Sequence, residues 1–318
     1  MSDEITKNDV GDVAPNSLAH IIGQAGVKAQ VSVAIEAAFA DSKKFDSAML
    51  VGAPGLGKSA LARIIAEEMA VEFHEVLGQS ITNPADLNAV LLGAKDKDVI
   101  HVDEAHLLVK PLQTSLYLAL DQRKLIVGSG GLGGKPQSIP IADFTLLLST
   151  TDEYCLLQPL RDRAKLVLRF DFYSAMELAE IVAVRSRSLG WGIDPAILPQ
   201  IAQRAKGTPR LALRLLQASR RVCRAAGETA ITLEHLEKAC LLEGIDGIGL
   251  GPVEQQYMRL LKEGVNKLGV LSSILGLPPR TIAAVTEPFL LRSGLIVKDD
   301  QSRRQLTARG REHLGGRT

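Results

Sequence analysis

Apolar and polar residues follow two different spacings along the first half of the chain. Short apolar runs predict buried strands, and the stretches between them have apolar residues three or four positions apart, which predicts amphipathic helices. The predicted strands are Ala48–Val51, Glu72–Val76, Val99–Val102, Phe144–Ser149 and Leu166–Phe170. The predicted helices are Val27–Asp41, Ser59–Ala70, Pro84–Leu92 and Leu112–Leu120. This alternation favours an α/β fold with a parallel sheet covered by helices, from about Val13 to Phe172.

The helical spacing continues alone from Ser174 to Glu243, where no strand is expected. Glycine-containing turns separate four predicted helices, Ala175–Leu189, Pro195–Ala205, Pro209–Ala225 and Leu233–Leu242. The pattern predicts a small helical domain.

A glycine-rich linker is predicted over 244–252, and a third pattern follows it. Helices are predicted at Glu254–Val265, Gly269–Leu275 and Arg280–Arg292, and a hairpin at Leu295–Lys298 and Arg303–Leu306. Three helices and a two-stranded wing are typical of a winged helix-turn-helix, which would set Arg280–Arg292 in a DNA groove. A small domain with a structural or protein-binding role is the alternative.

The chain is therefore predicted to have four parts. Residues 1–12 are polar and without periodicity, which predicts disorder. The large sheet domain spans 13–173, the small helical domain 174–243, and the winged-helix head 244–318.

A phosphate-binding loop lies between the first predicted strand and its helix. Residues 52–59 read G-x-x-x-x-G-K-S, with glycines at Gly52, Gly55 and Gly57. Glycines let backbone N–H groups turn toward phosphate oxygens at a helix N-terminus. Lys58 would reach the β- and γ-phosphates, and the hydroxyl of Ser59 would bind Mg²⁺. The alternative is an ordinary glycine turn.

Two carboxylates end the predicted strand Val99–Val102. Asp103 would hold Mg²⁺, and Glu104 would orient the water that attacks the γ-phosphate. Residues 103–106 also spell the D-E-A-H of a helicase superfamily, but the residues that follow differ from that superfamily. An acidic turn at a strand end is the alternative interpretation.

Three further motifs extend the predicted site. Ser149-Thr150-Thr151 ends a strand in hydroxyls, and such a hydroxyl can sense the γ-phosphate, a role assigned to Thr151. Arg161 and Arg163 follow a loop, from which an arginine could stabilise the transition state in a neighbouring subunit. Arg210 opens a helix and could couple the bound nucleotide to the small domain. For both arginine motifs, a structural ion pair is the alternative.

Composition sets broad limits on the function. The chain has 318 residues, 46% hydrophobic and 23% charged, which suits two or three globular domains. No apolar run approaches the ~20 residues that span a bilayer, and Met1–Asn8 does not resemble a signal peptide. Cys155, Cys223 and Cys240 lack metal-ligand spacing. We expect a cytoplasmic protein with no membrane contact.

Charge is unevenly distributed. Eleven Lys/Arg and seven Asp/Glu follow from Gly244 onward, so the net +1 divides into +4 there and −3 in the remainder. A basic C-terminal part suggests nucleic acid as its partner.

These motifs, in this order, resemble the RuvB family of AAA+ ATPases, the motors of Holliday junction branch migration. The resemblance runs from about Val13 to Leu314. It includes residues 22–24, 52–59, 103–106, 144–146, 149–151, 159–163, 170–173, 207–210, 287–290 and 293–296. It implies ATP and Mg²⁺ as cofactors, a homo-hexameric ring, double-stranded junction DNA as the substrate, and a RuvA-like partner bound by a hairpin at 125–141.

The resemblance also implies roles for individual residues. Arg163 would act in the neighbouring subunit, and Tyr173 would lie beside the adenosine, although a core tyrosine is an equally good interpretation. The nucleotide-binding set is Ile22, Gly52, Gly55, Gly57, Lys58, Ser59, Ala60, Tyr173 and Arg210. The catalytic set is Lys58, Asp103, Glu104, Thr151 and Arg163. The DNA-contacting set is Arg280, Lys298, Arg303 and Arg304.

Four departures from the family pattern indicate a divergent member or a paralogue. Ala14 stands where the family has an arginine, and Ala164-Lys165 replaces Phe-Gly after the arginine motif. The wing reads Gln-Ser-Arg-Arg at 301–304 instead of Pro-Arg-Gly-Arg. The tip of the 125–141 hairpin is rich in glycine, so its partner could differ.

The sequence therefore predicts an ATP-hydrolysing motor that moves duplex DNA in recombination and repair. Two alternatives stay open. One is an AAA+ loader or remodeller of a protein on DNA, and the other is a DNA-binding regulator switched by ATP.

Overall fold

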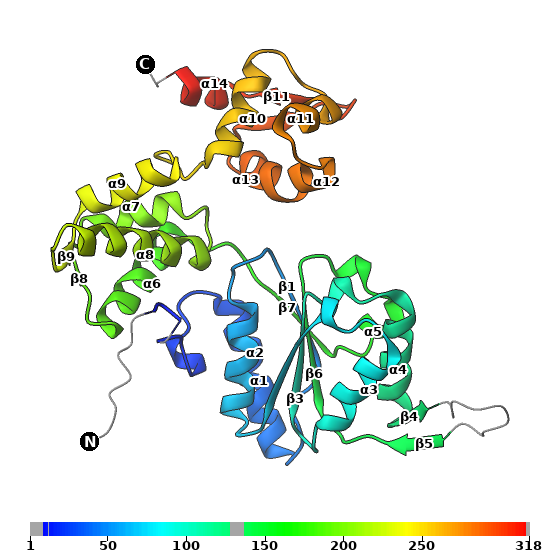
Figure 1. Cartoon of the computed structure of the whole chain (residues 1–318). Coiled ribbons are helices and arrows are strands. Elements are labelled where there is room, and N and C mark those ends of the chain that lie inside the picture. The colour runs from blue at the N-terminus through cyan, green and yellow to red at the C-terminus, as the bar shows by residue number, and fades with distance from the viewer. Residues whose placement is uncertain (1–8, 12, 128–136, 316–318) are drawn as a thin grey trace. The chain divides into compact units, whose positions relative to one another are not determined.

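The computed structural model describes residues 9–11, 13–127 and 137–315 of the chain (Figure 1). It divides into two compact units, which are described separately. The first contains residues 1–189 together with Thr208–Arg210, and the second contains 190–207 and 211–318. The predicted disorder of 1–12 lies mostly outside the described residues.

A five-stranded parallel sheet forms the centre of the first unit, as predicted. Its strands lie side by side in the order β2-β3-β6-β1-β7. Their bounds are β1 Ala48–Val51, β2 Phe73–Leu77, β3 Val99–Asp103, β6 Thr145–Thr150 and β7 Leu166–Arg169. Because all five strands run the same way, the polar residues that follow β1, β3 and β6 lie at one edge of the sheet.

Helices cover both faces of this sheet, with α1 and α2 on one face and α3 and α4 on the other (Figure 1). The helices of the first unit are α1 Ala25–Ala40, α2 Lys58–Glu68, α3 Pro84–Gly93, α4 Lys110–Gln122, α5 Gln158–Arg161 and α6 Ala175–Ser188. The side chains of Met49, Ile100, Leu116, Phe144 and Leu148 belong to one buried apolar cluster between sheet and helices. This core holds the strand ends in fixed positions.

A two-stranded antiparallel hairpin extends from the first unit. Its strands are β4 Lys124–Val127 and β5 Gln137–Pro140. The arms of the hairpin predicted at 125–141 are therefore confirmed, and its glycine-rich tip lies outside the described residues.

The second unit begins with the small helical domain. Its helices are α7 Ile197–Arg204, α8 Pro209–Ala225 and α9 Leu233–Glu243, and Pro209 and Arg210 at the start of α8 belong to the first unit. The expectation of no strand over 174–243 was wrong, because β8 Gly192–Ile193 and β9 Ala230–Ile231 pair in parallel. Two-residue strands are too short to leave a period-two pattern in a sequence.

The C-terminal part has the predicted helices and wing. The elements are α10 Pro252–Lys262, α11 Leu268–Leu275, α12 Pro279–Thr281, α13 Glu287–Arg292, β10 Ile296–Lys298, β11 Arg304–Leu306 and α14 Ala308–Gly315. The segment Arg280–Arg292 is helical as predicted, and it contains a π-helical stretch, Ile282–Thr286, between α12 and α13. Helix α14 was not predicted.

The glycine-rich linker predicted over 244–252 is an ordered loop at 244–251, and Pro252 begins α10. The side chain of Asp246 is fully buried and accepts hydrogen bonds from the backbone N–H groups of Ile248, at 3.0 Å, and Leu250, at 2.8 Å. Nε2 of His313, in α14, lies 2.8 Å from its other oxygen. The glycines of this loop therefore allow close packing rather than free motion.

No single helix among the described residues has the length and apolar composition to cross a membrane, although α11 and residues 279–292, a pair bent by 104°, meet that test when counted together. The division into 13–173, 174–243 and 244–318 stays a prediction.

Candidate nucleotide and DNA sites

The predicted phosphate loop lies between β1 and α2. Gly55 and Gly57 have φ angles of +81° and +99°, which L-residues with side chains rarely adopt. Helix α2 begins at Lys58, so its first N–H groups and the positive end of its dipole face the loop. The ammonium of Lys58 donates to the carbonyl oxygens of Gly52, at 2.8 Å, and Ala53, at 2.9 Å. Burial lowers the pKa of Lys58, so an anion beside it would stabilise its charged form.

The second half of the site comes from β3. The hydroxyl of Ser59 donates to Oδ2 of Asp103 at 2.9 Å, and Glu104, the next residue, is exposed. Glu104 has a φ of +51°, which turns the chain sharply at the end of the strand. A hydroxyl and a carboxylate this close offer the hard oxygen ligands that Mg²⁺ prefers, so the residues present fit that ion.

Tyr173 lies against both Gly23 and the phosphate loop. A Cβ atom at Gly23 would come 2.9 Å from the ring of Tyr173, so a larger residue would displace the ring. The phenol donates to the carbonyl oxygen of Leu56 at 3.2 Å, and burial raises its pKa. The segment of Ile22, also predicted to bind nucleotide, is thereby brought next to the loop.

Arg210 lies beside the same loop. Its backbone N–H donates to the carbonyl oxygen of Gly55 at 3.4 Å, and a Cβ atom at Gly55 would come 2.8 Å from Cβ of Arg210. The start of α8 therefore touches the loop through backbone atoms, while the side chain of Arg210 is exposed.

The two threonines at the end of β6 differ in their surroundings. Thr150 is buried and its hydroxyl is hydrogen-bonded to the backbone of Asp152. Thr151 is exposed, directly after the strand, where a hydroxyl can meet a ligand at the sheet edge. Of the two, only Thr151 has a side chain available for the predicted sensing role.

Arg163 is paired within its own chain. Its Nε donates to Oδ1 of Asp121 at 2.7 Å, a second guanidinium nitrogen bonds Oδ2, and the group lies 5.0 Å above the ring of Tyr117. These contacts hold the arginine at the surface, where its side chain is 30% exposed. The hydrogen bond from Arg163 lowers the pKa of Asp121.

The sequence did not lead us to predict a buried polar group within the sheet, next to the strand ends that form the site. Nε2 of His101 lies 2.7 Å from the hydroxyl of Ser149, and its Nδ1 lies 3.2 Å from Oε1 of Glu75. Burial lowers the pKa of His101, which favours the neutral ring. The signal in the sequence is a histidine inside an otherwise apolar strand.

Two of the four predicted DNA-contacting residues are held by a buried carboxylate in the head. Glu287 accepts hydrogen bonds from Nε of Arg304, at 2.7 Å, and from the phenol of Tyr257, at 2.9 Å, and Nζ of Lys298 lies 2.6 Å away. Arg304 is only 9% exposed at its side chain. Its observed contacts are structural, and its guanidinium is not part of the exposed basic surface of the wing.

Arg280 and Arg303 are exposed, whereas the helix-turn-helix around Arg280 is mostly apolar. The exposed residues near it include Val270, Ile274 and Val285, the last of them 69% exposed. A major-groove helix usually presents polar side chains to base edges. This composition makes the wing the better candidate for DNA contact.

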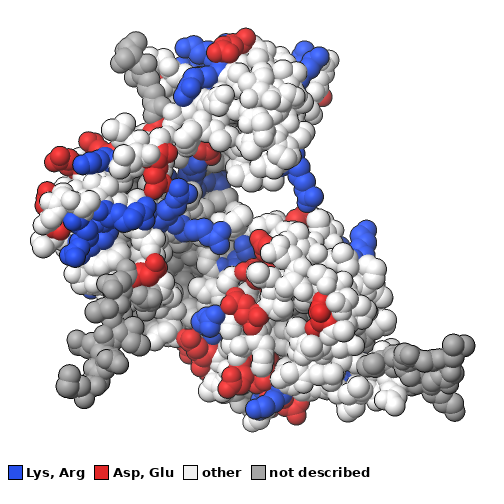
Figure 2. Space-filling view, in the orientation of Figure 1, with Lys and Arg blue, Asp and Glu red and all other residues white. Residues whose placement is uncertain are grey.

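A band of basic side chains crosses the region of α8 in the second unit (Figure 2). In the part of α8 that belongs to the second unit, from Leu211 onward, the exposed arginines are Arg214, Arg221 and Arg224. Glu243 neutralises part of the band through Arg214 at 2.8 Å and Arg221 at 3.5 Å.

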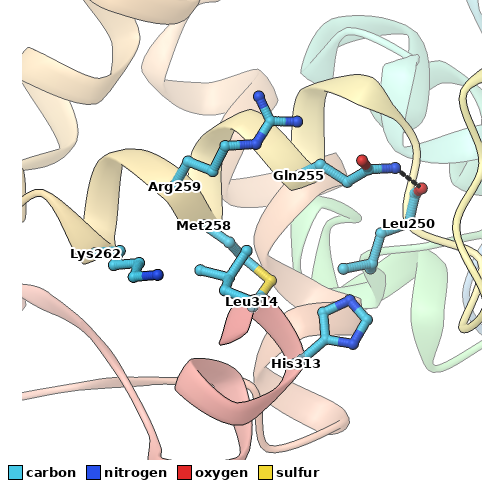
Figure 3. Close-up of a pocket in the computed structure, with 7 residues that line it drawn as sticks. All are labelled: Leu250, Gln255, Met258, Arg259, Lys262, His313 and Leu314. Carbon is cyan, nitrogen blue, oxygen red and sulfur yellow. Dashed lines mark hydrogen bonds between the residues drawn. The ribbon is translucent and has the colours of Figure 1, made fainter. Parts of the chain in front are cut away.

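Two cavities are lined by residues outside the phosphate loop, and one of them includes Tyr173. A cleft of about 470 Å³ is bordered by the start of α1, β7 and the segment of Tyr173, and none of residues 52–59 lines it. A cavity of about 240 Å³ lies between α10 and α14, beside Met258, Lys262 and His313 (Figure 3). Neither cavity contains the carboxylates or the lysine of the predicted catalytic set.

Three family descriptions match consecutive parts of the chain. Residues 13–170 match the Holliday junction DNA helicase RuvB P-loop domain, 173–246 the RuvB AAA lid domain, and 247–315 the RuvB C-terminal winged helix domain.

Relatives match over nearly the whole length. The Holliday junction branch migration complex subunit RuvB of Kosmotoga olearia is 34% identical, covering 98% of this chain and 94% of that protein. The subunit RuvB 2 of a Synechococcus species is 36% identical over 95% of this chain and 82% of that protein. The structure of the Thermotoga maritima RuvB Holliday junction branch migration motor has a TM-score of 0.82 at 31% identity, covering 95% of this chain and 98% of that one.

Proposed function

The chain belongs to the RuvB family of AAA+ ATPases, and we propose that it hydrolyses ATP to drive branch migration of Holliday junction DNA. The observation that carries this proposal is the contact of Ser59 with Asp103 at 2.9 Å, because it joins the phosphate loop to the acidic strand end. A loop that bound phosphate for a structural purpose would not need that carboxylate.

Several residues of the first unit have separate roles in the proposed hydrolysis. Lys58 and the N–H groups of the loop hold the β- and γ-phosphates. Ser59 and Asp103 would hold Mg²⁺, which neutralises phosphate charge when bound. Glu104, which is exposed beside them, orients the attacking water, and Thr151 contacts the γ-phosphate from the end of β6.

Nucleotide binding also uses residues outside the loop. Ile22 and Tyr173 would lie beside the adenosine, and Gly52 and Ala60 complete the loop and the first turn of α2. Arg210 would reach the phosphates, which is supported by the contact of its backbone with Gly55. Exchange of the bound nucleotide would thereby change the contacts of Arg210 at the start of α8.

The active form would be a hexameric ring in which Arg163 completes the neighbour's site. Arg163 would have to leave Asp121 and the ring of Tyr117 to do so, and both Arg163 and Asp121 are partly exposed to solvent, which weakens their attraction. Asp121 holds the arginine in the absence of a neighbour.

The head, residues 244–318, would bind duplex DNA through Arg303, Lys298 and Arg280. Contacts of this kind fix position without reading sequence. The hairpin of β4 and β5 would bind a RuvA-like partner, since one of its residues, Ile126, is an apolar side chain exposed at 63%.

A branch-migration assay on a synthetic four-way junction tests the proposal. We expect ATP- and Mg²⁺-dependent conversion of the junction to duplex products, increased by a RuvA-like protein. ATP hydrolysis without conversion, with or without that protein, would favour a loader or remodeller. Slow hydrolysis that DNA does not change would favour an ATP-switched regulator.

A further inference from the structure

One face of two neighbouring strands has a row of polar side chains that leads to the catalytic edge. Successive residues of a strand point to opposite faces, so His101 and Asp103 share one face of β3, and Ser149 lies on the same face of β6, two residues before Thr151. The inner members of the row, His101 and Ser149, are both fully buried.

The hydrogen bond between these inner members runs diagonally. The register of the sheet pairs His101 with Leu147, yet Nε2 of His101 lies 2.7 Å from the hydroxyl of Ser149, two residues nearer the strand end. This contact links β3 to the last residues of β6. Backbone hydrogen bonds between directly paired residues do not provide such a diagonal link.

Glu75 determines which way the hydrogen bond points. It pairs with His101 in register on β2, and its Oε1 lies 3.2 Å from Nδ1. A carboxylate only accepts, so Nδ1 is the donor, and in a neutral ring Nε2 then accepts from the hydroxyl of Ser149. Both ring nitrogens are thus satisfied without water.

Packing leaves the ring little freedom. Phe73 stacks on the imidazole with ring centroids 5.8 Å apart, and the side chain of His101 has no exposed surface. A buried donor or acceptor that loses its partner is costly, so His101 holds Ser149 in one position.

We infer that His101 is a positioning residue for hydrolysis, which fixes the end of β6, with Thr151, relative to Asp103 and Glu104 at the end of β3. The inference rests on the proposed ATPase site. His101 does not touch the nucleotide, and a displacement of catalytic groups by about 1 Å can lower a rate by up to ~10².

The test compares His101→Phe and Ser149→Ala with wild type. Each variant should lower kcat for ATP about tenfold, while the Kd for ATP stays within about twofold, because the phosphate loop is untouched. Combining the two changes should cost little more than either, since both break the same contact. His101→Gln, whose amide can accept from Ser149, should recover at least about half of the wild-type kcat.

Two controls separate the possible causes. His74→Phe changes a histidine of the same sheet that pairs with Asp98, away from the site, and should leave kcat unchanged. Thermal unfolding of Ser149→Ala, which removes a single oxygen atom, checks that the fold is intact if His101→Phe does not fold.

The inference is wrong if folded Ser149→Ala keeps wild-type kcat, or if kcat and ATP affinity fall together. The failure of the proposed function gives a different result. In that case wild type itself would have no more Mg²⁺-dependent hydrolysis than Lys58→Ala.

Discussion

The hydroxyl of Ser59 meets the carboxylate of Asp103 at 2.9 Å, although the two residues are 44 positions apart. The strand that leads into the loop before Ser59, β1, is not a neighbour of β3, which ends at Asp103, because β6 lies between them. The two halves of the site therefore meet across the end of β6, the strand that ends at Thr150 and is followed by Thr151. The position of this third strand end decides how well the site is assembled.

Changing Glu104 to Gln should separate binding from hydrolysis. The amide has the size of the carboxylate but cannot take a proton from water, so we expect ATP binding to persist and kcat to fall by at least ~10². Binding of a fluorescent ATP analogue and phosphate release measure the two properties. Glu67→Gln, an exposed change on α2, is the control, and wild-type turnover in Glu104→Gln would show that Glu104 is not the base.

Changing Gly55 to Ala should weaken ATP binding. The new Cβ would lie 2.8 Å from Cβ of Arg210, at a φ of +81°, so both the loop and the start of α8 would have to shift. A left-handed residue with a side chain costs about 1–2 kcal/mol, which predicts an affinity about tenfold lower. Gly93→Ala, with no atom near its new Cβ and no positive φ, should bind ATP normally in the same titration.

Changing Arg163 to Ala should abolish hydrolysis in a uniform assembly, by about 10³ or more if it acts as an arginine finger. A mixture with Glu104→Gln should regain activity, because the latter subunits supply Arg163 to intact sites. Asp121→Ala, which only removes the partner of Arg163, should stay active. An undiminished rate in pure Arg163→Ala would rule out the finger.

The stability of the head should depend on Glu287 at acidic pH. Burial alone would raise the pKa of Glu287, but the hydrogen bonds from Arg304, Lys298 and Tyr257 lower it overall. A lowered pKa gives stability that is complete above the ordinary glutamate value near 4.3 and is lost as the pH falls below it toward the folded value. Calorimetry across this range should show the loss, and Glu287→Gln, less stable at neutral pH, should show a flatter profile.

Replacing the adjacent arginines of the wing, Arg303 and Arg304, should affect different properties of the protein. Arg303→Ala should weaken binding to all duplex sequences and reduce the salt dependence by about one charge, because its side chain is exposed. Arg304→Ala should instead destabilise the protein by about 3 kcal/mol, since it leaves Glu287 buried without its arginine. Equal losses of DNA affinity in two equally stable variants would contradict this division.

The sequence predicted the sheet and the composition of the site because both follow local rules. A G-x-x-x-x-G-K-S loop needs its glycines and lysine at fixed spacings, and a parallel strand buried on both faces is a continuous apolar run. Lys58, Ser59 and Asp103 lie near one another at the edge of the sheet, whereas the place of Tyr173 beside the loop was expected only from the family resemblance.

Contacts between distant residues could not be predicted in the same way. The neighbouring sequence does not show that Arg304 is buried and Arg303 is exposed. The difference depends on the ion pair of Arg304 with Glu287, a residue 17 positions away. His101 was visible as an anomaly in an apolar strand, but its partners Glu75 and Ser149 come from other strands. The strands β8 and β9 are too short for any periodicity to appear.

The ordered loop at 244–251 limits how the protein can be engineered. A Cβ atom at Gly249 would come 2.1 Å from the carbonyl oxygen of Arg204, so the two backbones are in direct contact. Linkers ordinarily tolerate inserted spacers, tags and truncation points. Here a spacer would pull Asp246 away from His313, and a head fragment started at Gly244 would lose the surface of Arg204, so fusion points are better placed elsewhere in the chain.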